Sequence, residues 1–432
     1  MKTTKKQLSK YHQIIRELSD RIVLAQRPIR LLDAIKWDPS VKESFFKHKF
    51  KKLPPVTATY YHRYPLPYDP EAKNEEFYEI ESDIRRHLGQ FSAIGHIMQR
   101  MCREYRELVR MLSCRGGNEF SKLSQELYGS SEDVFYAGSP SLKDLSELIS
   151  NMLLNMKIKK NPTMDDKIYT SKQVVEILQE RLQRYFHVGG QKVGVKLSDG
   201  IIADAAAGAD FIKIRCGGYF NAREIKVFEV HEGWVHMGTT LNGMAQPICT
   251  FLGKGTPSST ITQEGLAIIL EIFTFASYPG RVRRLTNRIT AIHMAEKGAN
   301  FIDIFNFFRE QGLSEDESYG NATRVFRGSV PDNGPFTKDL TYSKGFVLIY
   351  NFIRLAIRKG LGSRIALLFT GKTTLEDLRT LEDLIDEGIV VPPKFIPPQF
   401  ADIGALSAWM CYSNFLNRFD LERVAADYKD VL

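Results

Sequence analysis

One short segment contains histidine and acidic residues of the types and spacing that hydrolytic chemistry requires. Residues 221–236 (NAREIKVFEVHEGWVH), a predicted helix after a predicted strand, contain His231, Glu232 and His236, two imidazoles that flank a carboxylate. In the metallopeptidase pattern HExxH the histidines lie about 40° apart around an α-helix, so that both reach one metal ion. In the pattern of this chain, HExxxH, a regular α-helix would separate them by about 140°. A shared metal therefore requires an irregular backbone.

Gly233 lies inside this pattern and permits two such backbones. One is a π-bulge, which widens a helical turn by one residue and occurs often at functional sites. The other is a helix that ends near Gly233, so that His236 turns back; glycine tolerates the backbone angles of either. The alternative is that the two histidines are unrelated, and these residues alone leave that open.

A second predicted helix supplies a third candidate ligand. Residues 257–276 (PSSTITQEGLAIILEIFTFA) suggest a helix with Thr262 as its N-cap and Glu264 in its first turn. Zinc hydrolases commonly complete a histidine pair with a glutamate from a following helix. Glu264 fits this role, although a first-turn carboxylate could merely complement the helix dipole. Glu271 is either a competing ligand or a group that holds a histidine N–H.

HExxxH followed by TQEGLA resembles the signature of the microtubule-associated tyrosine carboxypeptidases and their bacterial relatives, named for a QEGLA motif and linked by name to flavohaemoglobin expression. The resemblance extends to residues 31–56 and 324–346 and spans most of the chain. It implies one Zn²⁺ per chain, bound by His231, His236 and Glu264, with Glu232 as the catalytic carboxylate. The animal members remove a C-terminal tyrosine from α-tubulin, but none of these residues indicates that this chain has the same substrate preference.

Such a zinc site makes bound water more acidic, and Glu232 could act as its general base and then as general acid. A carboxypeptidase also needs a donor for the oxyanion and a cation for the terminal carboxylate of its substrate. Residues 324–346 contain candidates for both roles: Arg324, Arg327, Lys338, Tyr342 and Lys344. We expect Arg327 or Lys338 to bind the carboxylate and Tyr342 to bind the oxyanion; a surface charge or a packed tyrosine is the alternative for each.

Three other segments invite a functional interpretation. The strand FIKIR (211–215) could be an edge strand that pairs with extended substrate, or an ordinary sheet strand. FTGKTT (369–374) lacks the glycine of a phosphate-binding loop because position 366 is alanine. GRVRRLTNR (280–288) is more typical of a solvated helix face than of a site for an acidic partner.

The elements that must position these residues indicate a helix-rich α+β protein. Residues 8–160 have helical periodicity, including one long amphipathic helix over 81–112 and a helix over 141–156, with an extended proline-rich connection at 53–70. A helix over 171–187 precedes short alternating runs in 189–220, which predict a small antiparallel sheet next to the active-site helix. We therefore divide the chain into a helical N-terminal region (1–165) and a metallopeptidase-like catalytic domain (166–432).

Composition sets the class of protein. The chain has 432 residues, 43% hydrophobic and 25% charged, with five widely spaced cysteines and a net charge of +8. It contains no apolar run long enough to span a bilayer and no apolar segment behind its basic N-terminus, so we expect a cytoplasmic protein with reduced thiols and no membrane partner. The basic charge is modest and no nucleic-acid-binding motif accompanies it, which makes nucleic acid an improbable partner.

Together these observations predict a zinc metallopeptidase, a carboxypeptidase by resemblance, whose substrate is a peptide or protein C-terminus with a terminal residue that could be aromatic. Two alternatives remain open from the sequence. One is a non-catalytic regulator with a structural metal that binds nucleic acid or an acidic partner. The other keeps the metal but changes the reaction, to an aminopeptidase or another amide hydrolase.

Overall fold

The computed structural model describes residues 9–156, 159, 161–187, 190, 193–208 and 210–429. Residues 1–8, where the sequence predicts no secretory signal, lie outside the described residues. So do several residues between the predicted helices over 141–156 and 171–187, and several at the start of the run 189–220. The described chain is mostly helical, with a few short strands, which confirms a helix-rich α+β fold. No described helix combines the length and apolar character that crossing a membrane requires.

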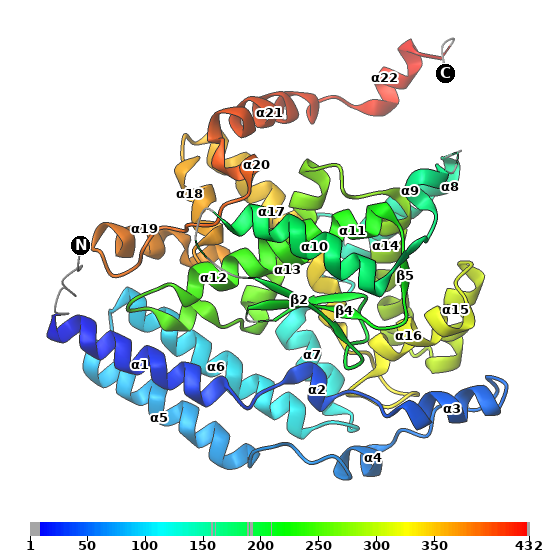
Figure 1. Cartoon of the computed structure of the whole chain (residues 1–432), viewed down its shortest axis with the longest axis horizontal. Helices are drawn as coiled ribbons and strands as arrows, with labels where there is room; N and C mark the ends of the chain where they lie inside the picture. Colours follow the sequence, from blue (N-terminus) through cyan, green and yellow to red (C-terminus); the bar gives the residue numbers. More distant parts are fainter. Residues whose placement is uncertain are drawn as a thin grey trace.

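The helices of the N-terminal region are α1 (Lys10–Gln26), α2 (Leu31–Ala34), α3 (Pro39–Lys47), α4 (Ala58–His62), α5 (Pro70–Leu88), α6 (Ala93–Ser113), α7 (Glu119–Tyr128), α8 (Leu142–Asn155) and α9 (Pro162–Asp165). The first six, α1 to α6, form a layer at the base of the molecule in Figure 1, whereas α8 and α9 lie at its upper right. Proline at the first helical position follows an aspartate cap in both α3 and α5, a strong start signal. The helix predicted over 141–156 is confirmed as α8.

The single long helix predicted over 81–112 is wrong, because the chain turns between α5 and α6. Gly89 adopts a φ of 86°, which favours glycine and ends α5, and the Ser92 side chain accepts from Gly95 N at 3.1 Å to start α6. Phe91, which the periodicity assigned to the apolar face, is 90% exposed in this turn. The turn lets α5 and α6 bury their apolar faces side by side, next to α1 (Figure 1).

Two small sheets precede the candidate active-site helix. β1 (Tyr169–Thr170) pairs antiparallel with β5 (Tyr219–Phe220), and α10 (Ser171–Phe186) lies between them in the sequence. The three-stranded sheet has the order β2-β4-β3, with bounds Gly194–Ser198, Phe211–Arg215 and Ala205–Ala207. β4 pairs parallel with β2 and antiparallel with β3, so this sheet is mixed rather than antiparallel throughout.

This strand order also decides between the two interpretations of FIKIR, in favour of an ordinary sheet strand. FIKIR is β4, and both of its edges already pair with neighbouring strands. A strand hydrogen-bonded on both sides has no free edge for substrate. The edge position belongs to β3 on one side and to β2 on the other.

The candidate site lies on the next helices. A continuous helical run contains α11 (Ala222–Phe228), η2 (Glu229–Met237) and α12 (Gly238–Met244), and it is followed by η3 (Thr250–Gly253) and α13 (Pro257–Phe273). The remaining elements are α14 (Pro279–Glu296), α15 (Phe301–Glu310), α16 (Glu315–Phe326), η4 (Thr337–Leu340), α17 (Thr341–Arg358), α18 (Ser363–Ala366), η5 (Leu367–Phe369), η6 (Leu375–Asp377), α19 (Leu378–Asp386), α20 (Pro398–Ala401), α21 (Ile403–Leu416) and α22 (Leu421–Asp427).

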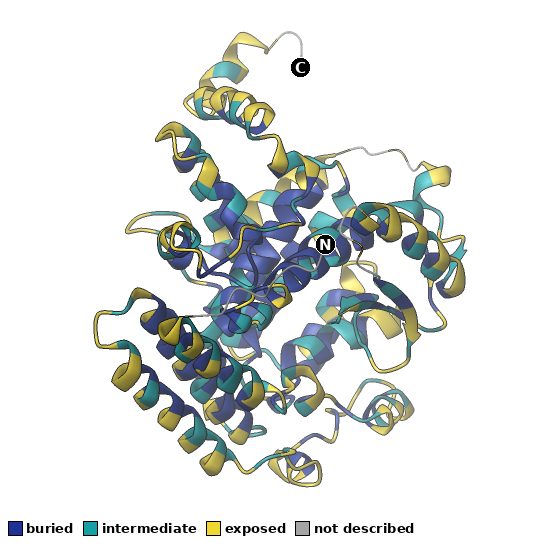
Figure 2. Cartoon of the chain, turned by 60° about the vertical axis from the view of Figure 1, so that its left-hand side comes forward, coloured by how far each residue is buried: buried dark blue, intermediate teal, exposed yellow. Residues whose placement is uncertain are grey.

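The largest apolar core includes residues on both sides of the predicted division at residue 165, among them Ile84, Tyr105, Leu266 and Ile349. Figure 2 shows this core as buried helices in the middle of the molecule, with the exposed α21 and α22 extending away from it. α13 passes through the core and lies directly against α17. A Cβ on Gly265 would lie 2.1 Å from the Gly345 carbonyl carbon, so only glycine permits this approach.

Candidate metal centre

The backbone of η2 explains how histidines five residues apart can face each other. η2 is a π-helix, and beyond its end the Gly238 N–H donates to the Gly233 carbonyl, a step of five residues. Residues five apart therefore lie close to one face of the helix. The rings of His231 and His236 meet edge to face, with centroids 4.7 Å apart. Of the two backbones that the sequence permits, the structure has the π-helix and not a helix end at Gly233.

Side chains from other elements hold this irregular turn in place. The His236 carbonyl accepts from Thr240 Oγ1 at 2.7 Å and from Lys372 Nζ at 3.0 Å. Lys372 also donates to Gln263 Oε1 at 3.1 Å, which ties η2 to α13. The sequence correctly excluded a phosphate loop at FTGKTT but missed Lys372. No sequence signal connects it to a carbonyl 136 residues away.

Glu264 completes the convergence from α13. Its Oε2 lies 3.2 Å from His231 Nε2 and 3.4 Å from His236 Nε2. The predicted helix start is wrong: Thr256 is the N-cap and Pro257 the first residue, so Thr262 lies inside the helix. Glu264 is thus about two turns into α13, beyond the first turn over which a helix dipole stabilises a carboxylate. Its position is explained by the histidines rather than by the helix start.

Glu271 holds the other nitrogen of His231. Its Oε1 accepts from His231 Nδ1 at 2.7 Å, and Arg281 donates to both of its oxygens at 2.9 and 3.1 Å. Glu271 is 0% exposed; burial opposes its charge, but Arg281 and His231 lower its pKa to about 2. Burial likewise opposes the charge of His231, but Glu264 and Glu271 raise its pKa to about 9. Of the two roles that the sequence leaves open for Glu271, a competing ligand or a group that holds a histidine N–H, the structure favours the second.

The three converging atoms have the composition and spacing of a zinc site. Zinc prefers imidazole nitrogen and carboxylate oxygen at about 2.0–2.2 Å, which makes donor-to-donor distances in a tetrahedron about 3.3–3.6 Å. The measured separations of 3.2 and 3.4 Å between Glu264 and the two histidines match this spacing closely. His231, His236 and Glu264 therefore fit the metal that the sequence predicts.

Glu232 lies beside these donors but is held separately. One atom each from His231, Glu232 and His236 lie within 4.8 Å of one another. Glu232 Oε2 accepts from the backbone N–H of Ala207 at 2.8 Å, in the edge strand β3. This hydrogen bond fixes the Glu232 carboxylate next to the candidate ligands and connects the small sheet to η2.

The candidates from residues 324–346 separate into those at the site and those away from it. Lys338 Nζ lies 3.5 Å from Glu264 Oε1, and the Tyr342 ring centroid lies 6.0 Å from that of His231. Burial raises the pKa of Tyr342, so its hydroxyl stays protonated. Lys344 points elsewhere and pairs with Asp133 at 2.7 Å. Arg327 is 4% exposed and lies against Phe336, 5.5 Å from its ring centroid.

Arg327 belongs to a second charged group, the arginine cluster, which we define as Arg288, Arg324, Arg327 and Asp339. Arg324 donates to both oxygens of Asp339 at 2.7 and 2.8 Å, and Arg288 Nε lies 3.6 Å from the same carboxylate. Burial and the charge of Arg324 lower the pKa of Arg288 and of Arg327 to about 10 each. Arg324 and Arg288 thus pair with one carboxylate, and the buried Arg327 adds a third positive charge that forms no ion pair of its own among the described residues.

The sequence identified Arg324 and Arg327 of this cluster as candidates but missed Arg288 and Asp339. It interpreted GRVRRLTNR as a solvated face, yet Arg281 and Arg288 turn inward, with side chains 11% and 14% exposed. They are seven residues apart and so lie on one face of α14, a spacing that could have identified them. Arg283, by contrast, is exposed as predicted.

The comparisons with known proteins agree with the motifs. No curated protein matches the chain. Residues 43–418, nearly the whole chain, match the family described as MATCAP, microtubule-associated tyrosine carboxypeptidase. This range contains η2, α13 and the arginine cluster. A broadly carboxypeptidase-like, enzymatic function follows from that match. The chain therefore belongs to the microtubule-associated tyrosine carboxypeptidase family.

Proposed function

We propose that this protein is a zinc-dependent carboxypeptidase that removes the last residue of a peptide or protein. The observation that carries the proposal is the convergence of His231 Nε2 and His236 Nε2 on Glu264 Oε2, at 3.2 and 3.4 Å, beside the carboxylate of Glu232. A zinc ion held by these three side chains would supply Lewis-acid chemistry, lowering the pKa of water toward 7 and polarising the scissile carbonyl.

Glu232 is the general base in this proposal. It takes a proton from the attacking water and delivers it to the leaving amine nitrogen. The Ala207 N–H holds one of its oxygens at 2.8 Å, which keeps the carboxylate oriented toward the donors rather than toward solvent. Lys372 donates both to the His236 carbonyl and to Gln263 of α13. These contacts keep His236 in position beside Glu232.

Tyr342 is the proposed oxyanion donor. Burial raises its pKa, and a protonated hydroxyl next to His231 can donate to the oxygen that becomes negative during the reaction. The guanidinium of Arg288, 5.4 Å from the centre of the Tyr342 ring, adds positive charge beside this tyrosine.

Lys338 or Arg327 binds the terminal carboxylate of the substrate. Lys338 is the nearer of the two to Glu264, whereas Arg327 lies within the arginine cluster, whose like charges repel one another. An anion beside this cluster would relieve that repulsion. A site with an excess of cations next to the candidate ligands suits a substrate that ends in a free carboxylate.

The test uses one zinc-loaded preparation and four versions of a single peptide that ends in tyrosine, the residue in the family name. The peptide is supplied free, N-acetylated, C-amidated, or blocked at both ends, and products are identified by mass spectrometry. A carboxypeptidase cleaves the free and N-acetylated forms and releases the last residue. Cleavage of the amidated form from its N-terminus would show an aminopeptidase instead. Replacing the terminal tyrosine by other residues then measures specificity. A cytoplasmic location and a domain division at residue 165 remain predictions from the sequence.

A further inference from the structure

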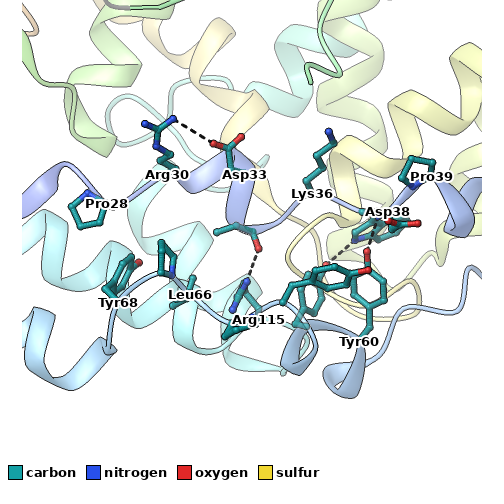
Figure 3. A pocket seen from close by; sticks show the side chains of 16 residues that line it. Pro28, Arg30, Asp33, Lys36, Asp38, Pro39, Tyr60, Leu66, Tyr68 and Arg115 are labelled. Carbon is teal, nitrogen blue, oxygen red and sulfur yellow. Dashed lines mark hydrogen bonds and ion pairs between the residues drawn. The ribbon is translucent and has the colours of Figure 1, made fainter. Parts of the chain in front are cut away.

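A cavity of about 360 Å³ lies in the N-terminal layer and shares no lining residue with the candidate metal centre (Figure 3). Segments 28–39 and 60–68 form its walls, together with Arg115 at the end of α6. Its volume is at the lower end of the range of about 300–1,000 Å³ that ligand pockets occupy. Prolines and the rings of Trp37, Tyr60, Tyr61, Tyr64 and Tyr68 make these walls mainly apolar.

One cation of this cavity has no acidic partner. Arg115 donates to the carbonyls of Leu112 at 2.9 Å and Ala34 at 2.6 Å, and it forms no ion pair within the described ranges of the chain. The other two cations at the rim are exposed to solvent, unlike Arg115: Arg30 lies 4.0 Å from Asp33, and Lys36 is an exposed residue. Burial lowers the pKa of Arg115, as expected for a charge without a matching anion.

One hydroxyl of the cavity is also without a partner. The Tyr68 Oη is buried and makes no hydrogen bond to any described residue. By contrast, Tyr61 Oη accepts from Trp37 Nε1 at 2.8 Å and donates to the Ser329 carbonyl at 3.1 Å. Tyr60 Oη accepts from the Asp38 N–H at 2.7 Å. Hydrogen bonds thus fix Trp37, Tyr60 and Tyr61, and protein atoms cover the Tyr68 hydroxyl, so that Arg115 is the group with remaining capacity for an anion.

We propose that this cavity binds an organic carboxylate with a flat apolar body about the size of one aromatic ring. The carboxylate accepts from the Arg115 guanidinium, and the ring packs among Trp37, Tyr61 and Leu66. A single unmatched cation suits a single negative charge. A proline-rich peptide would suit the aromatic walls but would leave Arg115 without an anion. The ligand is either a free aromatic acid or the last residue of a peptide.

The test is a calorimetric titration of the full-length protein with phenylacetate, beside phenylacetamide, its neutral counterpart. We expect phenylacetate to bind and to change the fluorescence of Trp37, and phenylacetamide to bind about tenfold more weakly or not at all. Arg115→Gln should weaken phenylacetate binding about tenfold or more. Arg30→Gln, which changes a rim cation already paired with Asp33, should leave the affinity within about twofold.

Two further variants make the result decisive. Arg115→Lys keeps the positive charge but loses the forked pair of donors, and it should weaken binding about threefold or more even if Arg115→Gln proves to be misfolded. Lys338→Gln should not change phenylacetate binding, because Lys338 belongs to the candidate metal centre. Loss of binding in Lys338→Gln with retention in Arg115→Gln would overturn the proposal, since the acid would then occupy the candidate active site. Equal affinities for acid and amide, or no binding of the acid at millimolar concentrations, would overturn it as well.

A tripeptide that ends in phenylalanine distinguishes the two sources of ligand. It is titrated with its carboxylate free and with it amidated, in the presence of a chelator so that no metal-dependent cleavage occurs. Binding of the free peptide at least as tight as that of phenylacetate indicates a peptide C-terminus. Binding of phenylacetate alone indicates a free acid. If only a proline-rich peptide binds, the carboxylate proposal is wrong.

Discussion

Two charged centres lie near Tyr342, and they differ in kind. In the candidate metal centre, electron-pair donors of His231, His236 and Glu264 converge, and Lys338 lies 3.5 Å from Glu264. In the arginine cluster, Arg324 and Arg288 both pair with Asp339, so that cations outnumber carboxylates. Hydrolysis at the end of a chain needs positive charge at the scissile carbonyl and again at the terminal carboxylate. In our proposal a metal ion supplies the first of these charges, and side chains of the protein supply the second.

The two centres also differ in how they are stabilised. The metal centre depends on an irregular helical turn whose freed carbonyl is satisfied by Thr240 and Lys372. The arginine cluster is built on regular helices, α14 and α16, and on the short η4. We therefore expect substitutions in the first to change the chemistry most, and substitutions in the second to change stability and substrate binding.

The largest effect is expected for Glu232→Gln. The amide keeps the shape of the side chain but cannot accept the proton of water, so kcat should fall about 10³-fold or more while bound zinc remains. Glu229→Gln is the control, because Glu229 lies in the same π-helix but pairs with Arg181 at 3.0 Å. Full activity of Glu232→Gln in a peptide assay would exclude Glu232 as the base.

Asp339→Asn should lower the free energy of unfolding by about 3 kcal/mol at pH 7, because it leaves Arg324 and Arg288 without their shared carboxylate. The exposed Glu180→Gln, which breaks a pair with Arg184, should cost only about 0.5 kcal/mol. Urea unfolding curves measure both. A loss no larger for Asp339→Asn than for Glu180→Gln would mean that the arginines do not depend on this carboxylate.

Asp339→Asn should also change how the free energy of unfolding responds to acid. Burial opposes the charge of Asp339, but Arg324 and Arg288 hold its pKa well below the ordinary value of 3.8. A carboxylate with a lowered pKa contributes stability above its unfolded pKa and loses that contribution as the pH falls toward its folded pKa. The difference in unfolding free energy between wild type and Asp339→Asn should therefore be complete at pH 7 and shrink below about pH 4. A difference that grows in acid would contradict this linkage.

Glu271→Gln tests the orientation of His231. Removing the charge that holds His231 Nδ1 should weaken zinc binding about 10–100-fold. Competition with a coloured zinc chelator measures the affinity. Because the glutamine still fills the space, an unchanged zinc affinity would show that Glu271 acts only on Arg281.

The smallest effect is expected for Lys338→Gln. If Lys338 binds the terminal carboxylate, KM for a peptide with a free C-terminus should rise about tenfold, with a smaller change in kcat. Lys344→Gln is the control, since Lys344 pairs with Asp133. An unchanged KM in Lys338→Gln together with a raised KM in Arg327→Gln would assign the role to Arg327.

The local parts of the site could be predicted from the sequence. The HExxxH spacing excludes a regular α-helix by geometry alone, and Gly233 indicates where the irregularity lies. Choosing the π-helix required Lys372 and Gln263, which come from distant elements. The start of α13 was misplaced because Thr256 and Thr262 are both suitable caps, and Pro257 at the first position decides between them.

Non-local pairing set the limit elsewhere. Nothing in FIKIR itself distinguishes a central strand from an edge strand. Its central position follows from β2 and β3, two other segments that pair with it on opposite sides. Apolar periodicity continues through the turn at Phe91, so pattern alone joined α5 to α6. Arg288 of the arginine cluster was missed because charged residues usually face solvent, and its inward position depends on Asp339 from another segment.

The most direct test of the central claim is the zinc content of the purified protein by elemental analysis, for wild type beside His236→Ala. We predict about one zinc per chain in the wild type and a large loss in the variant, since His236 supplies one of three protein ligands. Circular dichroism of both proteins excludes unfolding as the cause. No zinc in the wild type after zinc has been supplied, or equal zinc in both proteins, would contradict the account.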